Sequence, residues 1–136
     1  MRPFHLAFPV DNLTAAKAFY GDLLGCGVGR ECEDWVDFNF FGHQITAHLA
    51  QPEAAPQTNP VDGQIIPVRH FGLILEMQEW QDLQQRLTNL GVKFKVLPQI
   101  RFRGKRGEQA TFFIVDPSGN HLEFKAFQSD SAIFES

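Results

Sequence analysis

The sequence is poor in the features that would point to a secreted, membrane or nucleic-acid-binding protein. It has two cysteines among 136 residues, too few for a disulfide framework. Acidic residues outnumber basic ones, 16 to 12, so no overall positive charge favours nucleic acid or an anionic membrane. No apolar run reaches the roughly 18–20 residues of a membrane span, and the first residues do not resemble a secretion signal. We therefore expect a cytoplasmic protein with reduced thiols that binds neither nucleic acid nor membrane.

Polar aromatic residues are also scarce, whereas phenylalanine is abundant. There are 14 phenylalanines against one tyrosine and two tryptophans. Such a set supplies much apolar surface with few hydrogen-bonding groups, which suits a strand-rich core or a dry pocket. Hydrophobic residues make up 43% and charged residues 21%, as in a globular protein rather than a disordered chain. At this length we expect a single domain over residues 1–136.

The chain contains the same arrangement of elements twice. A short alternating run with a histidine near its start opens each half, at 4–8 and at 69–75. Each run is followed by apolar residues at helical spacing that end at a glycine, Gly25 in the first half and Gly91 in the second. The interval from histidine to glycine is 20 residues in one half (5 to 25) and 21 in the other (70 to 91). We interpret the halves as two copies of one module.

After each helix the apolar residues take the period of two that is typical of strands. These segments are 35–41 and 44–49 in the first half, and 92–97, 111–115 and 121–125 in the second. The pattern predicts an α+β fold of two paired βαβββ modules that form a curved mixed sheet. Module one covers about 1–50 and module two about 64–128, with a loop-like linker at 51–63 and a C-terminal tail at 129–136. Neither module alone has enough residues for a robust core, so each should pack on the other or on a partner chain.

Three side chains in this repeat could bind a metal ion. His5 and His70 hold the same place in the two modules, and Glu123 faces away from its apolar neighbours because side chains alternate along a strand. A carboxylate in a sheet concavity is costly unless positive charge meets it. Two histidines and one carboxylate suit a non-haem Fe(II) site, and related sets hold Zn, Mn or Ni. We predict that the sheet surrounds a cleft with a divalent metal, Fe(II) being the first choice.

The chain resembles the vicinal oxygen chelate superfamily, which comprises glyoxalases, bleomycin resistance proteins and extradiol dioxygenases. Nearly the whole chain shares the resemblance, whose strongest marks are His5 ahead of residues 18–25, AFYGDLLG, and the closing residues 116–124, DPSGNHLEF. In that family a histidine on the first strand of each module and a glutamate on the last strand typically hold the metal. The resemblance therefore implies His5, His70 and Glu123 as ligands.

Glyoxalase I-like members of the family add a glutamate on the last strand of the first module. This sequence has no acid there, and the nearest candidate is His48, or Thr46 if the strand aligns without a two-residue shift. The resemblance thus leaves either a three-ligand site of the extradiol type or a site of three histidines and one glutamate. Residues 35–45 also look like small proteins described as predicted extradiol-type dioxygenases.

The resemblance implies a metal-dependent enzyme, an extradiol-type ring-cleaving dioxygenase that acts on a small aromatic diol. We expect His48 to act as the catalytic base, with His43 and His121 as weaker options. Residues 99–108 carry four of the 12 basic residues and would form a mobile lid, whose Arg101 and Arg103 bind an acidic substrate.

Two other functions fit the same fold. One is a glyoxalase-like isomerase, lyase or thiol transferase that uses the same metal site to stabilise an oxyanion. The other is a metal-free binding protein of the resistance type, which the intact set of two histidines and one glutamate disfavours. In each case the expected partners are a small molecule and a second copy of the chain in a homodimer.

Overall fold

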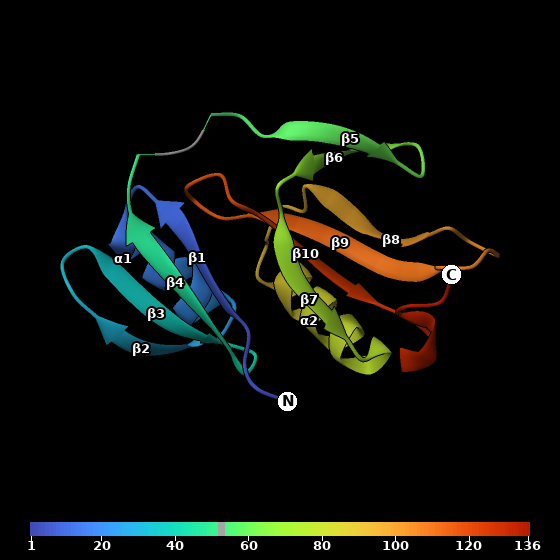
Figure 1. Cartoon of the computed structure of the whole chain (residues 1–136), viewed down its shortest axis with the longest axis horizontal. Helices are drawn as coiled ribbons and strands as arrows, with labels where there is room; N and C mark the ends of the chain where they lie inside the picture. Colours follow the sequence, from blue (N-terminus) through green and yellow to red (C-terminus); the bar gives the residue numbers. More distant parts are fainter. Residues whose placement is uncertain (52–53) are drawn as a thin grey trace. The chain divides into compact units, whose positions relative to one another are not determined.

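The computed structural model describes residues 1–51 and 54–136, which form two units (Figure 1). Unit 1 comprises Met1–Ala55 and Asp116–Asn120, and unit 2 comprises Pro56–Val115 and His121–Ser136. Each unit contains a strand, a helical segment and three further strands, so the predicted α+β fold of paired βαβββ modules is confirmed. The strands of the two modules form two separate four-stranded sheets, where the sequence pattern predicted one.

Unit 1 has a helical segment packed against a mixed sheet. Its elements are β1 (His5–Val10), α1 (Leu13–Ala16), the π-helical segment η1 (Lys17–Leu23), β2 (Gly27–Glu31), β3 (Trp35–Phe40) and β4 (His43–Leu49). The sheet order is β1-β4-β3-β2, and only β1 and β4 run parallel. The Asn12 side chain accepts a hydrogen bond from the backbone of Ala15 at 2.9 Å, which caps the helix, and Gly25 ends it at a φ of 76°. The predicted βαβββ module implied a third strand after the helix, but the position of β2 was not predicted.

The core of unit 1 centres on Tyr20, which is fully buried in η1. Its ring lies 4.9–5.3 Å from those of Phe8, Phe19 and Phe38. Its hydroxyl donates a hydrogen bond of 2.7 Å to the carboxylate of Asp116, in the turn at 116–120. The pKa of Tyr20 is raised well above its usual value, mainly by burial and to a lesser extent by the neighbouring carboxylate of Asp116.

Unit 2 repeats the arrangement with a longer helix. Its module consists of β7 (Phe71–Leu75), α2 (Met77–Asn89), β8 (Val96–Arg101), β9 (Gln109–Val115) and β10 (His121–Ala126), and the 3-10 turn η2 (Asp130–Ala132) follows. The order β7-β10-β9-β8, with β7 parallel to β10, matches that of unit 1. Three residues of the predicted helical stripe, Trp80, Leu83 and Leu87, are buried against the sheet, whereas the fourth, Leu90, is exposed. The indole of Trp80 donates to the carbonyl oxygen of Phe124 at 2.9 Å.

A hairpin that the sequence pattern did not predict precedes this module. Its strands are β5 (Gln57–Val61) and β6 (Gln64–Val68), which pair only with each other. Asp62 and Gly63 connect them with positive φ angles of 47° and 76°, as a two-residue hairpin turn requires. The predicted loop at 51–63 is therefore wrong over 57–61, and its residues 52 and 53 lie outside the described residues.

The strand expected at 92–97 is shifted towards the C-terminus. It begins at Val96 and ends at Arg101, because the pairing of β8 with β9 continues as far as Arg101 opposite Gln109. Part of the predicted basic loop is therefore strand, and the loop itself is confined to 102–108. No helix in the described part of the chain combines the length and the apolar character that crossing a membrane requires.

Candidate metal centre

Alternation along β10 places Glu123 on the face of the unit 2 sheet opposite α2. Leu122 and Phe124 are fully buried on the helix side, where the Phe124 ring packs against Phe112. Glu123 faces the other way and pairs with Phe113 of β9. The predicted division of β10 into two faces is confirmed, and the Glu123 side chain is 8% exposed.

The backbone of Glu123 lies unusually close to β7. Gly72 is its partner in the parallel pair, and a Cβ atom added to Gly72 would lie 1.6 Å from the carbonyl oxygen of Glu123. Only glycine permits this approach, because any side chain at position 72 would collide with main-chain atoms. The spacing of β7 and β10, and with it the position of Glu123, thus depends on Gly72.

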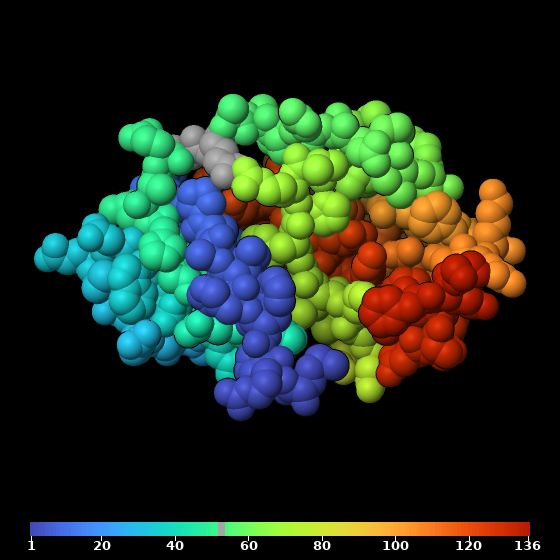
Figure 2. All heavy atoms as spheres, viewed as in Figure 1, coloured from blue at the N-terminus to red at the C-terminus, as the bar shows by residue number. Residues whose placement is uncertain are grey.

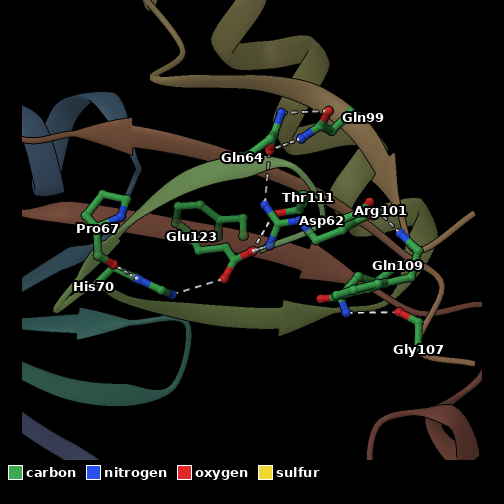
Figure 3. A network of polar contacts seen from close by, with 12 residues as sticks. Asp62, Gln64, Pro67, His70, Gln99, Arg101, Gly107, Gln109, Thr111 and Glu123 are labelled. Carbon is green, nitrogen blue, oxygen red and sulfur yellow. Dashed lines mark hydrogen bonds and ion pairs between the residues drawn. The ribbon is translucent and has the colours of Figure 1, made fainter. Parts of the chain in front are cut away.

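His70 directs one ring nitrogen at this carboxylate. It lies just before β7, and its Nδ1 is 2.6 Å from the carbonyl oxygen of Pro67, so Nδ1 carries the proton. Its Nε2 is 3.2 Å from Glu123 Oε1 (Figure 3). In the neutral ring, Nε2 carries no proton, and its lone pair faces a negatively charged oxygen. This contact is therefore stable only if a proton or another cation is shared between the two atoms.

Without a metal, the contact with Glu123 favours protonation of the His70 ring. The hydrogen bond with Glu123 raises the pKa of His70 above its ordinary value, although burial opposes the change. Burial alone would raise the pKa of Glu123, but the hydrogen bonds with His70 and Thr111, together with the positive charges of Lys125 and His70, lower it. The two groups favour each other's charged form.

The second carboxylate oxygen of Glu123 has its own partners. Oε2 accepts a hydrogen bond of 2.5 Å from the hydroxyl of Thr111 and lies 3.4 Å from Nη1 of Arg101. Both of these residues are buried. The two oxygens of Glu123 thus face different surroundings, with His70 on one side and a hydroxyl with a guanidinium on the other.

This pair fits part of a metal site. Among the described residues, no three histidine, cysteine, aspartate or glutamate side chains come together as a group that could hold a metal ion. Unit 2 supplies two of the three predicted ligands, His70 and Glu123. Metal-binding histidines commonly donate their other ring nitrogen to a backbone carbonyl, as His70 does to Pro67, and a carboxylate completes a chemically suitable pair.

His5, the third predicted ligand, lies in unit 1. It is the first residue of β1 and is exposed, on the side of the sheet opposite the buried Phe8 and Val10. Its neighbour on β4 is Gln44. Its role as a ligand stays a prediction.

Strand register identifies which residue of unit 1 corresponds to Glu123. Glu123 is paired with the residue two positions after His70. The residue of β4 that is paired two positions after His5 is Thr46, and His48 lies two residues further along the strand. Thr46 therefore holds the equivalent position. His48 is exposed, about 13 Å along the strand from the neighbour of His5, and its catalytic role stays a prediction.

Unit 1 has a buried carboxylate that the sequence pattern did not single out. Asp37 of β3 accepts a hydrogen bond of 2.6 Å from the hydroxyl of Thr46, its partner on β4. Gln44 donates to it at 3.4 Å, and the exposed Arg30 lies 3.9 Å away. The signal in the sequence that could have identified it is an acidic residue, Asp37, among the alternating apolar residues at 35–41. The sheet of unit 1 thus carries a buried carboxylate on β3, whereas the sheet of unit 2 carries one on β10.

The remaining predicted residues lie in different environments. Arg101 is at the end of β8 and buried beside Glu123, whereas Arg103 is exposed in the loop at 102–108. His43 accepts a hydrogen bond from the backbone of Phe4 through Nδ1, and His121 begins β10. The contacts of Arg101 and Thr111 with Glu123 could not be found by sequence reasoning, because they depend on strand register.

Residues 2–124 match the model of the Glyoxalase/Bleomycin resistance protein/Dioxygenase superfamily. The chain belongs to this superfamily. A glyoxalase/bleomycin resistance protein/dioxygenase from Alicyclobacillus acidocaldarius is 32% identical with a TM-score of 0.83, over 97% of this chain and 96% of the other. The superfamily contains many enzymes, and its members often bind divalent metals. No curated protein sequence matches the chain.

Two solved structures of lower identity share the fold. The fosfomycin resistance protein FosX from Listeria monocytogenes is 17% identical, with a TM-score of 0.69 over 97% of each chain. The lactoylglutathione lyase from Agrobacterium tumefaciens is 21% identical, with a TM-score of 0.63 over 92% of each chain. At these identities the likeness concerns the fold alone.

Replacing Gly72 with Ala should destabilise unit 2 and displace Glu123. The added Cβ cannot fit beside the carbonyl oxygen of Glu123, so β7 and β10 must separate, at a cost of about 3 kcal/mol. Urea unfolding measures this loss. The control is Gly21→Ala, whose Cβ would make ordinary contacts at 3.7 Å or more. Equal stability of the two variants would contradict the close approach.

The stability of the metal-free protein should depend on pH through His70 and Glu123. The pKa of His70 is raised from 6.5, so its contribution is complete below about pH 6.5 and lost as pH rises through the folded-state value. The pKa of Glu123 is lowered from 4.5, so its contribution is present above about pH 4.5 and lost as pH falls through the folded-state value. The free energy that separates the wild type from His70→Gln should be largest between these values. A difference that does not vary with pH in urea unfolding would refute the coupling.

Proposed function

We propose that the chain is a divalent-metal-dependent enzyme of the extradiol-dioxygenase type, acting on a small aromatic diol. The observation that supports it most directly is the pair of His70 Nε2 and Glu123 Oε1, 3.2 Å apart, in which Pro67 fixes the ring so that Nε2 is free to bind a cation. His5 is the proposed third ligand, from the sequence. Fe(II) is the proposed metal, with Mn, Ni and Zn as alternatives.

The residues of unit 2 would prepare the site before any substrate binds. Pro67 holds the ring of His70 in one tautomer, and Thr111 holds Glu123 in one orientation. Phe113 lies beneath them, fully buried, with its ring 4.9 Å from that of His70, and keeps this side of the site dry. When bound, Fe(II) would supply the Lewis acidity that lowers the pKa of a substrate hydroxyl and the redox chemistry that oxygen requires.

The position equivalent to Glu123 favours a dioxygenase over a glyoxalase-like enzyme. Thr46 holds that position in unit 1, and its hydroxyl is already bonded to Asp37. The Thr46 hydroxyl is uncharged and already donates a hydrogen bond to Asp37, so it is a poor substitute for a second glutamate ligand. A set of three ligands leaves more positions open, enough for a chelating diol together with oxygen.

Further roles are proposed for two residues outside this pair. His48 is exposed and would act as the base towards a substrate hydroxyl. Arg103 is exposed in the loop at 102–108 and could meet an acidic substrate directly, whereas the charge of Arg101 is already opposite Glu123. The homodimer stays a prediction.

The decisive experiment is anaerobic purification with metal analysis, followed by oxygen uptake on a panel of catechols after Fe(II) is restored. We expect one metal per chain and oxygen consumption coupled to formation of a yellow ring-cleavage product. Bound Zn or Ni without oxygen consumption would instead indicate an isomerase, lyase or transferase. A protein that stays metal-free after addition of divalent ions would indicate a binding protein.

Replacing either proposed ligand of unit 2 should abolish metal retention. His70→Ala removes a donor nitrogen and Glu123→Gln removes the negative charge of the donor oxygen, so the dissociation constant for Co(II) should rise by more than about 100-fold. The matched control is His43→Gln, whose imidazole is occupied by the backbone of Phe4. Retention of metal by both ligand variants, with wild-type affinity, would rule out this site.

A further inference from the structure

We propose that Arg101 is a positioning residue that makes Glu123 a one-oxygen ligand. Arg101 and Thr111 hold Oε2 of Glu123, so that only Oε1, the oxygen beside His70, is offered to a cation. The inference rests on the proposed function, because it concerns how Glu123 would bind the metal.

The contacts at Glu123 separate its two oxygens. The hydroxyl of Thr111 donates to Oε2 at 2.5 Å, and Nη1 of Arg101 lies 3.4 Å from the same atom. Binding a cation through both oxygens would require Oε2 to leave these partners. Since the carboxylate and the guanidinium are only 8% and 6% exposed, water could not replace the lost contacts.

The β5–β6 hairpin holds Arg101 in this position. Nη2 of Arg101 lies 3.5 Å from Oε1 of Gln64, and the carboxamides of Gln64 and Gln99 bond to each other in both directions, at 3.1 and 2.5 Å. At the tip of the hairpin, Asp62 accepts a hydrogen bond of 3.0 Å from the backbone of Phe102. Figure 2 shows the atoms of the hairpin (green) against those of β8 and the following loop (orange). The hairpin thus braces Arg101 against Glu123.

Phe113 provides a common support for both neighbours of Glu123. The centroid of its ring lies 6.0 Å from Cζ of Arg101 and 4.9 Å from the ring of His70. Phe113 is paired with Glu123 across β9 and β10 and is fully buried. Arg101 and His70 therefore approach Glu123 over one rigid apolar surface, each towards its own oxygen.

The need for stability does not explain a charge at position 101. Nε of Arg101 is buried and has no hydrogen-bond partner within the described part of the chain, which costs free energy. An apolar side chain of similar size would avoid both this loss and the desolvation of the charge. What the guanidinium supplies and an apolar residue cannot is its contact with Oε2.

The test is a titration with Co(II), followed by visible absorption and calorimetry, on the wild type and Arg101→Met. Without the guanidinium, Oε2 is held by the Thr111 hydroxyl alone and the repulsion on the incoming cation disappears. We expect Co(II) to bind about tenfold more tightly and its absorption to change as a second oxygen coordinates. Arg101→Lys keeps the charge and should restore the wild-type spectrum. The control Lys105→Met removes an exposed positive charge from the same segment and should change neither quantity.

The outcomes separate this inference from the proposed function. If the wild type binds Co(II) and Arg101→Met has the same affinity and spectrum, the inference is overturned and the metal site stands. If the wild type binds no Co(II), the proposed function fails, and the inference with it. Should Arg101→Met not fold, Gln64→Ala is the second variant. It removes the brace and should shift affinity and spectrum in the same direction by a smaller factor, and a wild-type spectrum would overturn the inference.

Discussion

The candidate site depends on one contact, in which a ring nitrogen of His70 faces a carboxylate oxygen of Glu123. This contact is stable only when a proton or a metal cation lies between the two atoms. Nδ1 of His70 holds its proton against the carbonyl of Pro67, so Nε2 faces Glu123 Oε1 at 3.2 Å with an electron pair. The hydrogen bond with Glu123 favours the protonated ring in the metal-free protein and so raises the pKa of His70. A divalent cation would satisfy the contact more strongly, because it accepts electron pairs from both atoms.

The backbone brings these atoms together before any side chain contributes. The parallel pairing of β7 and β10 sets Glu123 beside Gly72, where no other residue fits, and two residues earlier the chain turns at His70. Burial strengthens the contact, because the Glu123 carboxylate is largely shielded from water and water therefore cannot replace its protein partners. Thr111 occupies the oxygen that His70 does not use. The position of the Glu123 carboxylate thus depends on Gly72, on the register of β7 with β10 and on the hydrogen bond from Thr111.

The elements that depend on local patterns could be predicted from the sequence. The two helices ending at Gly25 and Gly91, the division of β10 into two faces and the repetition of a βαβββ module all follow from short-range periodicity. Features that depend on strand register could not be predicted. The pairing of β8 with β9 continues as far as Arg101, which places that strand later in the chain than expected. Whether Thr46 or His48 corresponds to Glu123 is decided by the partner of each on β1. Strand register also decides the position of Arg101, which is paired with Gln109 of β9 and is buried in unit 2 instead of lying on a lid.

The most direct test of the account is where a bound metal lies. Crystals of the protein soaked in Co(II) and measured at the cobalt absorption edge give an anomalous peak at the ion. The account predicts this peak about 2.0–2.3 Å from both His70 Nε2 and Glu123 Oε1, with Oε2 still bonded to Thr111. A peak at other residues, or none while the two atoms remain 3.2 Å apart, would contradict it.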